Sequence, residues 1–236
     1  MAAEESLLID VRDGIVTLSL NRPGRRNALD GELVSRLRTA FEAHGGARGL
    51  VVRSASAGMF CAGADLSVPD AERAAVSRDL YALYGQMIAV PAPVLAALDG
   101  PAVGGGAQLA VACDLRLAGP AGSVRFLGPG HGLAVGAWAL PALVGRGRAL
   151  DLCLTGRTVD PEEALRIGLV DRLAADASAA AAQLAAEIAA LDPGAVARVK
   201  AVSARALADG GAAALAQEAE GNAAWAGGAP GLRRPR

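Results

Sequence analysis

Three consecutive glycines, at residues 104–106, stand where the sequence predicts that a strand passes into a helix. The apolar run at 93–98 is typical of a buried strand, and residues 108–112 predict the start of a helix. Glycines at such a junction let the backbone approach a ligand closely, and N–H groups at a helix N-terminus attract negative charge. The stretch fits an anion or oxyanion site and a flexible turn equally well. A second stretch at 60–66, FCAGADL, favours the site.

The elements expected to position these stretches alternate between strands and helices. Asp13-Gly14 is a strong hairpin signal, and Asp30 can cap the first helix. We expect strands at 6–12, 14–20, 49–53, 93–98, 114–118, 124–127 and 170–173. We expect helices at 31–43, 69–90, 146–154 and 161–167. The Gly-rich segment 127–137 stays unassigned. From residue 176 onward only helices are expected, at 177–190, 193–207 and 211–225. This order predicts an α/β fold with a core at 1–175, a C-terminal helical segment at 176–226 and a flexible tail at 227–236.

Composition restricts the class of protein. The chain has 236 residues, of which 53% are apolar and 3% aromatic, so we expect one domain with a core of Ala, Val and Leu. A net charge of −1 argues against nucleic acid or an anionic membrane as a partner. Three scattered cysteines and two histidines predict buried reduced thiols and no metal site. No signal peptide and no apolar run of ~20 residues is present, which predicts a cytoplasmic protein.

A set of short motifs resembles the crotonase (enoyl-CoA hydratase/isomerase) family over residues 6–205. The motifs are NRP at 21–23, NAL at 27–29, FCAGADL at 60–66, GPAVGGG at 100–106, CDLR at 113–116, LPALVG at 140–145, LTGR at 154–157 and EALRIGLV at 163–170. Each is weak alone, but their order and spacing together are specific. The resemblance implies a spiral of strand–strand–helix units whose C-terminal helices build trimers, often paired into hexamers.

The shared chemistry of this family implies a function for both stretches. Two backbone N–H groups hold the carbonyl of an acyl-CoA thioester, and they fall here on Ala64 and Gly105. The position of Gly105 suits this role because a helix dipole would point at the developing negative charge. Removal of one such donor typically costs ~2.7–4 kcal/mol of transition-state stabilisation.

The resemblance also places the rest of the ligand. Contacts to coenzyme A would come from Arg25, Arg26, Ala28, Ala62, Asp65, Leu66 and Lys200. Guanidinium groups suit phosphates, and Lys200, which is the only lysine, would reach a phosphate from the C-terminal helices, even across a subunit boundary. The acyl pocket would include Leu127, Gly130 and Trp138. No cofactor is expected beyond the coenzyme A of the ligand itself.

The sequence departs from the family pattern at both catalytic glutamates of the hydratases. Gln108 stands at the first position and Gly130, after Pro129, at the second. An amide exchanges no proton near neutral pH, and each missing general acid or base costs ~10²–10⁴ in rate. The main hypothesis is therefore an acyl-CoA-binding protein of fatty acid metabolism that lacks rapid hydration.

A working enzyme is the alternative hypothesis. His131, one residue past the second glutamate position, could serve as acid or base, although a histidine packed in a loop or core is the more common case. Decarboxylation of a malonyl-type thioester would need only the two N–H groups. For Tyr81 and Tyr84, core packing is favoured over a pocket role.

Overall fold

The computed structural model describes residues 5–208, 215–216 and 219–220. Its main sheet has six strands in the order β1-β2-β3-β4-β6-β9. These strands are β1 (Leu7–Arg12), β2 (Ile15–Leu20), β3 (Gly49–Ser54), β4 (Val94–Leu98), β6 (Leu115–Ala118) and β9 (Arg172–Leu173). β1 and β2 form an antiparallel hairpin with Leu7 opposite Leu20, and the other neighbours are parallel. The Asp13-Gly14 turn has φ values of +53° and +77°, as the predicted hairpin requires.

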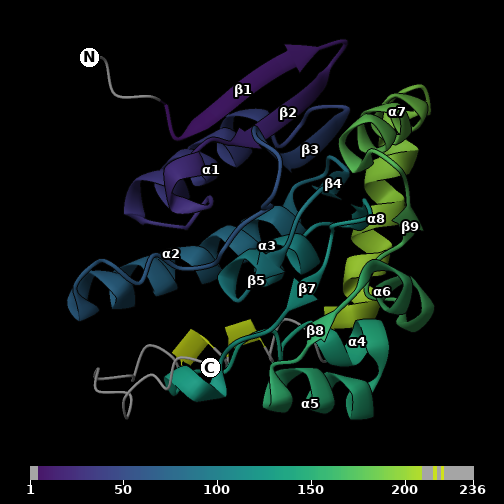
Figure 1. The fold of residues 1–236 in the computed structure, drawn as a ribbon. Coiled ribbons are helices and arrows are strands. Elements are labelled where there is room, and N and C mark those ends of the chain that lie inside the picture. The colour runs from purple at the N-terminus through teal and green to yellow at the C-terminus, as the bar shows by residue number, and fades with distance from the viewer. Residues whose placement is uncertain (1–4, 209–214, 217–218, 221–236) are drawn as a thin grey trace.

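Helices cover both faces of this sheet, which explains why β4 is buried along its whole length. The larger core lies toward α1 (Gly31–His44), α2 (Asp70–Ala89) and α3 (Gly105–Ala112), and includes Leu50 and Val52 of β3. Val51 points to the opposite face, where it packs with Leu95 and Leu117 against α7 (Ala177–Ala189). Figure 1 shows these two groups of helices on opposite sides of the strands.

A second, three-stranded sheet carries the glycine stretch. It pairs β5 (Ala102–Val103) with β7 (Val124–Arg125), and β7 with β8 (Thr158–Val159). The shorter helices of the chain are η1 (Pro23–Arg25), η2 (Pro129–His131), α4 (Leu140–Val144), α5 (Arg146–Thr155) and α6 (Pro161–Ile167). η1 and η2 are single 3-10 turns, and both end in a residue with left-handed conformation.

The C-terminal helices close the molecule. The N-terminus of α7 is bound by Asp99, whose carboxylate accepts from the N–H groups of Ala177 and Ser178 at 2.7 and 2.9 Å and from the Ser178 hydroxyl at 2.6 Å. α8 (Pro193–Ala208) follows, lies beneath α7 in the view of Figure 1, and contacts α2 through the bond from Lys200 to the Met87 carbonyl. Within the described ranges no helix is long and apolar enough to cross a membrane.

The α/β fold is confirmed, and most predicted elements occur within one to three residues of their predicted ends. Two-residue strands β5 and β8 and the short helix α4 escaped prediction because so few residues give no periodic signal. The predicted strand at 124–127 is shorter, ending at Arg125. The predicted helix at 211–225 and the tail at 227–236 lie mostly or wholly outside the described residues.

Candidate functional site

The glycine stretch begins a helix earlier than predicted. α3 begins at Gly105 and not at Gln108, so the glycines form its first turn instead of a loop before it. Gly104 has φ +54°, and its N–H donates to the Arg125 carbonyl of β7 at 2.8 Å. In the described ranges no acceptor binds the Gly105 N–H. This N–H lies in the first turn of α3, where N–H groups have no partner within the helix. This donor is therefore available to a ligand.

The FCAGADL stretch presents a second free donor beside it. Leu29 pairs with this loop in the parallel sense: its N–H donates to the Gly63 carbonyl at 2.8 Å, and its carbonyl accepts from the Asp65 N–H at 3.0 Å. The Ala64 N–H between these two bonds has no acceptor among residues 5–208. The two strand-like bonds thus hold the Ala64 peptide with its N–H turned away from Leu29.

The two N–H groups lie on closely packed backbone segments. A Cβ built on Gly105 would be 3.5 Å from the Ala64 nitrogen, and one built on Gly63 would be 3.1 Å from the Gly105 nitrogen. The loops are joined through Cys61, whose carbonyl accepts from the Val103 N–H at 2.9 Å. Two converging backbone donors at a helix N-terminus can bind one oxygen atom that carries negative charge.

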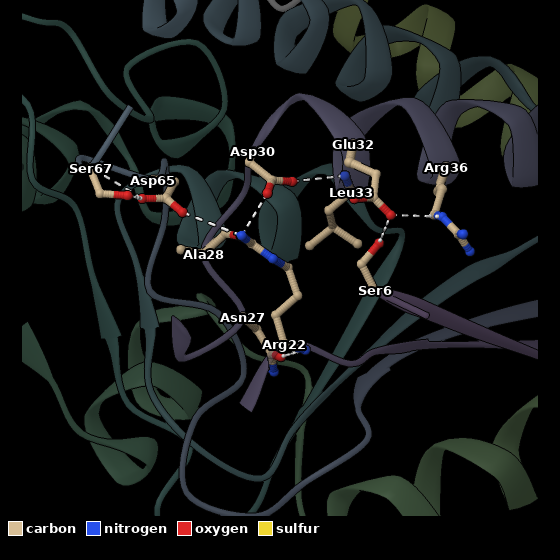
Figure 2. A network of polar contacts seen from close by, with 10 residues as sticks. All are labelled: Ser6, Arg22, Asn27, Ala28, Asp30, Glu32, Leu33, Arg36, Asp65 and Ser67. Atoms are coloured by element: carbon tan, nitrogen blue, oxygen red, sulfur yellow. Dashed lines mark hydrogen bonds and ion pairs between the residues drawn. The ribbon is translucent and has the colours of Figure 1, made fainter. Parts of the chain in front are cut away.

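Arg22 links the loop at 21–28, the start of α1 and the Ala64 loop (Figure 2). Its guanidinium donates to the Ala28 carbonyl, pairs with Asp30, and lies 3.4 Å from Asp65 Oδ2. Asp30 in turn caps α1 by accepting from the Leu33 N–H at 2.9 Å. Arg22 therefore fixes the segments on both sides of the Leu29–Ala64 pairing.

Asp65 directs its carboxylate into the protein. Its Oδ1 accepts from the Ser67 hydroxyl at 2.6 Å and the Ser67 N–H at 3.0 Å. The hydrogen bond from the Ser67 hydroxyl lowers the pKa of Asp65 below its usual value; burial opposes this shift, and Arg22 adds to it. Asp65 thus orders the loop as an anion, and its contacts are all with the chain itself.

Asn27 has a structural role that sequence reasoning missed. It is buried with φ +54°, and its Nδ2 donates to Ser54 Oγ at 2.8 Å and to the Phe60 carbonyl at 3.0 Å. These bonds join the Arg25–Arg26 loop to the FCAGADL stretch. Asparagine tolerates left-handed backbone well, which was the available signal in the sequence.

Gln108 lies one helical turn after Gly105 and is only 4% exposed. Its Oε1 accepts from the Gly136 N–H and from Trp138 Nε1, each at 3.0 Å. Trp138 stacks on Tyr84 at a centroid distance of 6.3 Å, and the Tyr84 hydroxyl donates to the Gly105 carbonyl at 2.9 Å. The predicted packing role of the tyrosines is confirmed by their burial, but Tyr84 also ties α2 to the first turn of α3.

The remaining predicted residues lie in varied surroundings. Arg25, Arg26 and Leu66 are exposed, Ala28 is buried, and Ala62 donates its N–H to the Arg26 carbonyl at 3.0 Å. At the second glutamate position Gly130 is exposed, and the neighbouring His131 and Leu127 are half-buried. Trp138 lines a cavity of about 1070 Å³ between α2, α3, α4 and α8, while Leu127 and Gly130 do not.

Lys200 is held inside the subunit. Its Nζ lies 2.7 Å from Asp114 Oδ2 and donates to the carbonyls of Ala92 at 2.9 Å and Met87 at 3.2 Å. The side chain is 9% exposed, and an ammonium has three protons to donate. Lys200 therefore fastens α8 to the ends of α2, β4 and α3, a role that its predicted contact with a phosphate did not anticipate.

The cysteines are structural thiols. All three are free and buried, as predicted, and burial raises the pKa of Cys61 and of Cys113 to about 12. In the part of the chain that the structure describes, no cluster of His, Cys, Asp and Glu side chains could hold a metal ion.

Comparison with known proteins identifies the relatives of this chain. Residues 10–224 match the family model described as enoyl-CoA hydratase/isomerase. A Mycobacterium leprae protein named "Probable enoyl-CoA hydratase echA6" is 40% identical over 198 residues, covering 80% of this chain and 79% of its own. The mouse "Enoyl-CoA hydratase domain-containing protein 2, mitochondrial" is 38% identical over 172 residues, covering 69% and 58%.

Solved structures agree with the sequence relatives. An enoyl-CoA hydratase from Bacillus anthracis superimposes with a TM-score of 0.82 at 28% identity, covering 92% of this chain and 90% of its own. An enoyl-CoA hydratase/isomerase from Xanthobacter autotrophicus gives a TM-score of 0.85 at 28% identity, covering 96% and 89%. The motifs, the fold and the relatives lead to one conclusion: the chain belongs to the enoyl-CoA hydratase/isomerase family.

Proposed function

We propose that this protein binds acyl-CoA thioesters, with the thioester carbonyl held between the N–H groups of Ala64 and Gly105. The observation that carries the proposal is the close approach, at the N-terminus of α3, of two backbone N–H groups that have no acceptor among the described residues. A carbonyl oxygen can accept both bonds, and the helix dipole strengthens them as charge moves onto that oxygen. Membership of the enoyl-CoA hydratase/isomerase family supports the same ligand class.

The coenzyme A part of the ligand would lie along the loop at 21–28. Arg25 and Arg26 are exposed there, a few residues from Ala28, and the Arg26 carbonyl accepts from the Ala62 N–H. Arginines on an anchored loop can pair with phosphates bidentately. In this proposal Asp65 and Lys200 do not contact coenzyme A. Asp65 orders the loop that carries Ala64, and Lys200 fixes the position of α8.

Hydration is not part of the proposed function. Gln108 carries no ionisable group, and Gly130 has no side chain to supply one. His131 is half-buried in η2, and among the described residues no hydrogen bond links it to Ala64 or Gly105. We therefore do not propose an enzyme that uses His131 as its acid or base. The proposal is thus an acyl-CoA-binding role in fatty acid metabolism.

Assembly into trimers, or hexamers made of trimers, belongs to the same proposal. Exposed apolar side chains support it because subunit interfaces bury such groups. Leu154 of α5 is 67% exposed, and Val199 and Val202 of α8 are 67% and 68% exposed.

The test compares a thioester with its carbonyl-free analogue. Butyryl-CoA and S-butyl-CoA, a thioether, are titrated calorimetrically into the wild type and into Gly105→Pro, which removes one donor at a helix position that tolerates proline. Wild type should prefer the thioester by about 2- to 13-fold per hydrogen bond, and the variant should lose part of this preference while still binding the thioether.

Two results would contradict the proposal. One is equal affinity of the wild type for thioester and thioether. The other is hydration of crotonyl-CoA by the wild type at ordinary enzyme rates of roughly 1–10³ per second, because that would establish an enzyme instead of a binding protein. Circular dichroism of Gly105→Pro verifies that the variant is folded.

A further inference from the structure

We propose that the amide of Gln108 recognises an oxygen on the third carbon of the acyl chain, and that the preferred ligands are 3-oxoacyl thioesters. This inference rests on the proposed thioester binding and specifies its ligand. It assigns Gln108 a role of its own in place of the glutamate chemistry that the residue cannot perform.

The orientation of the amide follows from its partners. Oε1 faces two donors, the Gly136 N–H and the indole N–H of Trp138, both at 3.0 Å. The opposite orientation would place the NH₂ group against two other N–H groups, so the amide has one allowed position. Stacking of Trp138 on Tyr84 holds the indole donor in place. Gln108 is consequently a rigid residue with both acceptor lone pairs occupied.

The other half of the amide has no hydrogen-bond partner among the described residues. Among the described residues no acceptor forms a hydrogen bond with Gln108 Nε2, although the residue is only 4% exposed. Nε2 is also not among the fully buried unpaired side-chain atoms of the described residues, so it keeps a small accessible surface. A dry site would leave this donor unpaired at a cost of about 1–3 kcal/mol, which a ligand with an oxygen there would remove.

The position of this donor matches the third carbon of a bound thioester. Gln108 follows Gly105 by three residues in α3, so its side chain projects from the same side of the helix as the Cα of Gly105. Tyr84 contacts the Gly105 carbonyl and stacks on Trp138, which bonds to Gln108, so the two positions share one wall. With the first carbonyl at Gly105, an oxygen two carbons further along the chain comes toward Nε2.

A ketone fits this donor better than other groups. Because Oε1 is saturated, Gln108 offers only N–H, and a keto oxygen only accepts. A 3-hydroxyl group would bring a proton for which Gln108 has no free acceptor, and a saturated or 2-enoyl chain has no oxygen at this carbon. The amide therefore favours a ligand group that only accepts hydrogen bonds at this position.

The experiment uses ligands of equal chain length. Acetoacetyl-CoA, 3-hydroxybutyryl-CoA and butyryl-CoA are titrated into the wild type, Gln108→Glu and Gln108→Met. The wild type should bind acetoacetyl-CoA about 2- to 13-fold more tightly than butyryl-CoA, with the hydroxy ligand in between. Gln108→Glu keeps an acceptor for Gly136 and Trp138 but replaces the donor by an oxygen. Its preference for the ketone should therefore vanish or reverse. Gln108→Met has no amide and should also lose the preference.

Several outcomes would overturn the inference: butyryl-CoA or 3-hydroxybutyryl-CoA binding to the wild type as tightly as acetoacetyl-CoA, or an unchanged ketone preference in Gln108→Glu. If the variants do not fold, the relative affinities of the three ligands for the wild type still show whether a 3-oxo group is preferred. Failure of every acyl-CoA to bind would instead refute the proposed function, so the two failures are distinguishable.

Discussion

Gly63 shows at the scale of one residue how the sequence encodes the donor pair. Its φ is +91°, a conformation that residues with a Cβ rarely adopt, and an added Cβ would lie 2.7 Å from the Val103 carbonyl oxygen. The glycine thus permits the chain to place Ala64 beside Gly105. Glycine is required here by both backbone conformation and space.

Replacement of Gly63 by alanine should therefore disturb both stability and binding. Left-handed strain alone costs about 1–3 kcal/mol, and the close contact with Val103 adds to it. We expect a lower unfolding free energy in urea and weaker binding of butyryl-CoA. The matched control is Gly147→Ala in α5, where an added Cβ meets nothing within 4 Å; equal stability losses in the two variants would contradict the argument.

The family motifs in the sequence point to Ala64 and Gly105 as a candidate donor pair, but the sequence did not predict the surroundings of Gln108. Its motif position revealed a missing carboxylate, while its partners Gly136 and Trp138 come from residues 127–138, which have no periodic pattern. Contacts between irregular segments depend on the tertiary fold, which local propensity does not encode. Lys200 illustrates the same limit, because its three acceptors lie more than 80 residues away in the chain.

At the scale of elements, the site is a junction of segments that Arg22 and Asp65 hold together. The loop at 21–28, the N-terminus of α1 and the loop bearing Ala64 meet at one guanidinium (Figure 2). The strands and α1 were predictable from alternation and an Asp cap, whereas this junction was not, since it joins residues 43 positions apart.

The lowered pKa of Asp65 predicts a dependence of stability on pH. A carboxyl whose pKa is lower in the folded state stabilises it above the unfolded value near 3.8, and this contribution is lost as the pH falls through the folded value. The difference in unfolding free energy between wild type and Asp65→Asn should be constant near neutrality and shrink below pH about 5.

Urea unfolding over a series of pH values measures this difference. Asp10→Asn, at a carboxylate whose side chain is 54% exposed, serves as the control. If the difference in unfolding free energy between wild type and Asp65→Asn stays the same down to pH about 3, Asp65 does not stabilise the fold as an anion.

For the whole molecule, Lys200 determines how α8 is attached to the core. The ammonium joins Asp114 and two backbone carbonyls, and burial raises the pKa of Asp114 even though Lys200 opposes that shift. α8 also forms one wall of the large cavity beside Trp138. The attachment of this helix therefore shapes the cavity beside Trp138.

Lys200→Met should lower the unfolding free energy by about 1–3 kcal/mol because it leaves the Asp114 carboxylate and two carbonyls without their partner. Adding Asp114→Asn to this variant should restore part of the loss, since no charge then stays uncompensated. Urea denaturation measures both. Arg198→Met, an exposed change on the same helix, should alter stability by less than about 0.5 kcal/mol; a loss as large as that of Lys200→Met would refute the assignment.

The carboxylate of Asp99 binds the N-terminus of α7 across 78 residues of sequence, and it immediately precedes the glycine stretch. During synthesis at about 5–20 residues per second, the ribosome needs roughly 4–16 s to add the chain between these partners. Throughout that interval the nascent sheet has one bare apolar face, around Leu95 and Leu117. Until α7 is made, this face is uncovered, and a chaperone could bind the growing polypeptide there.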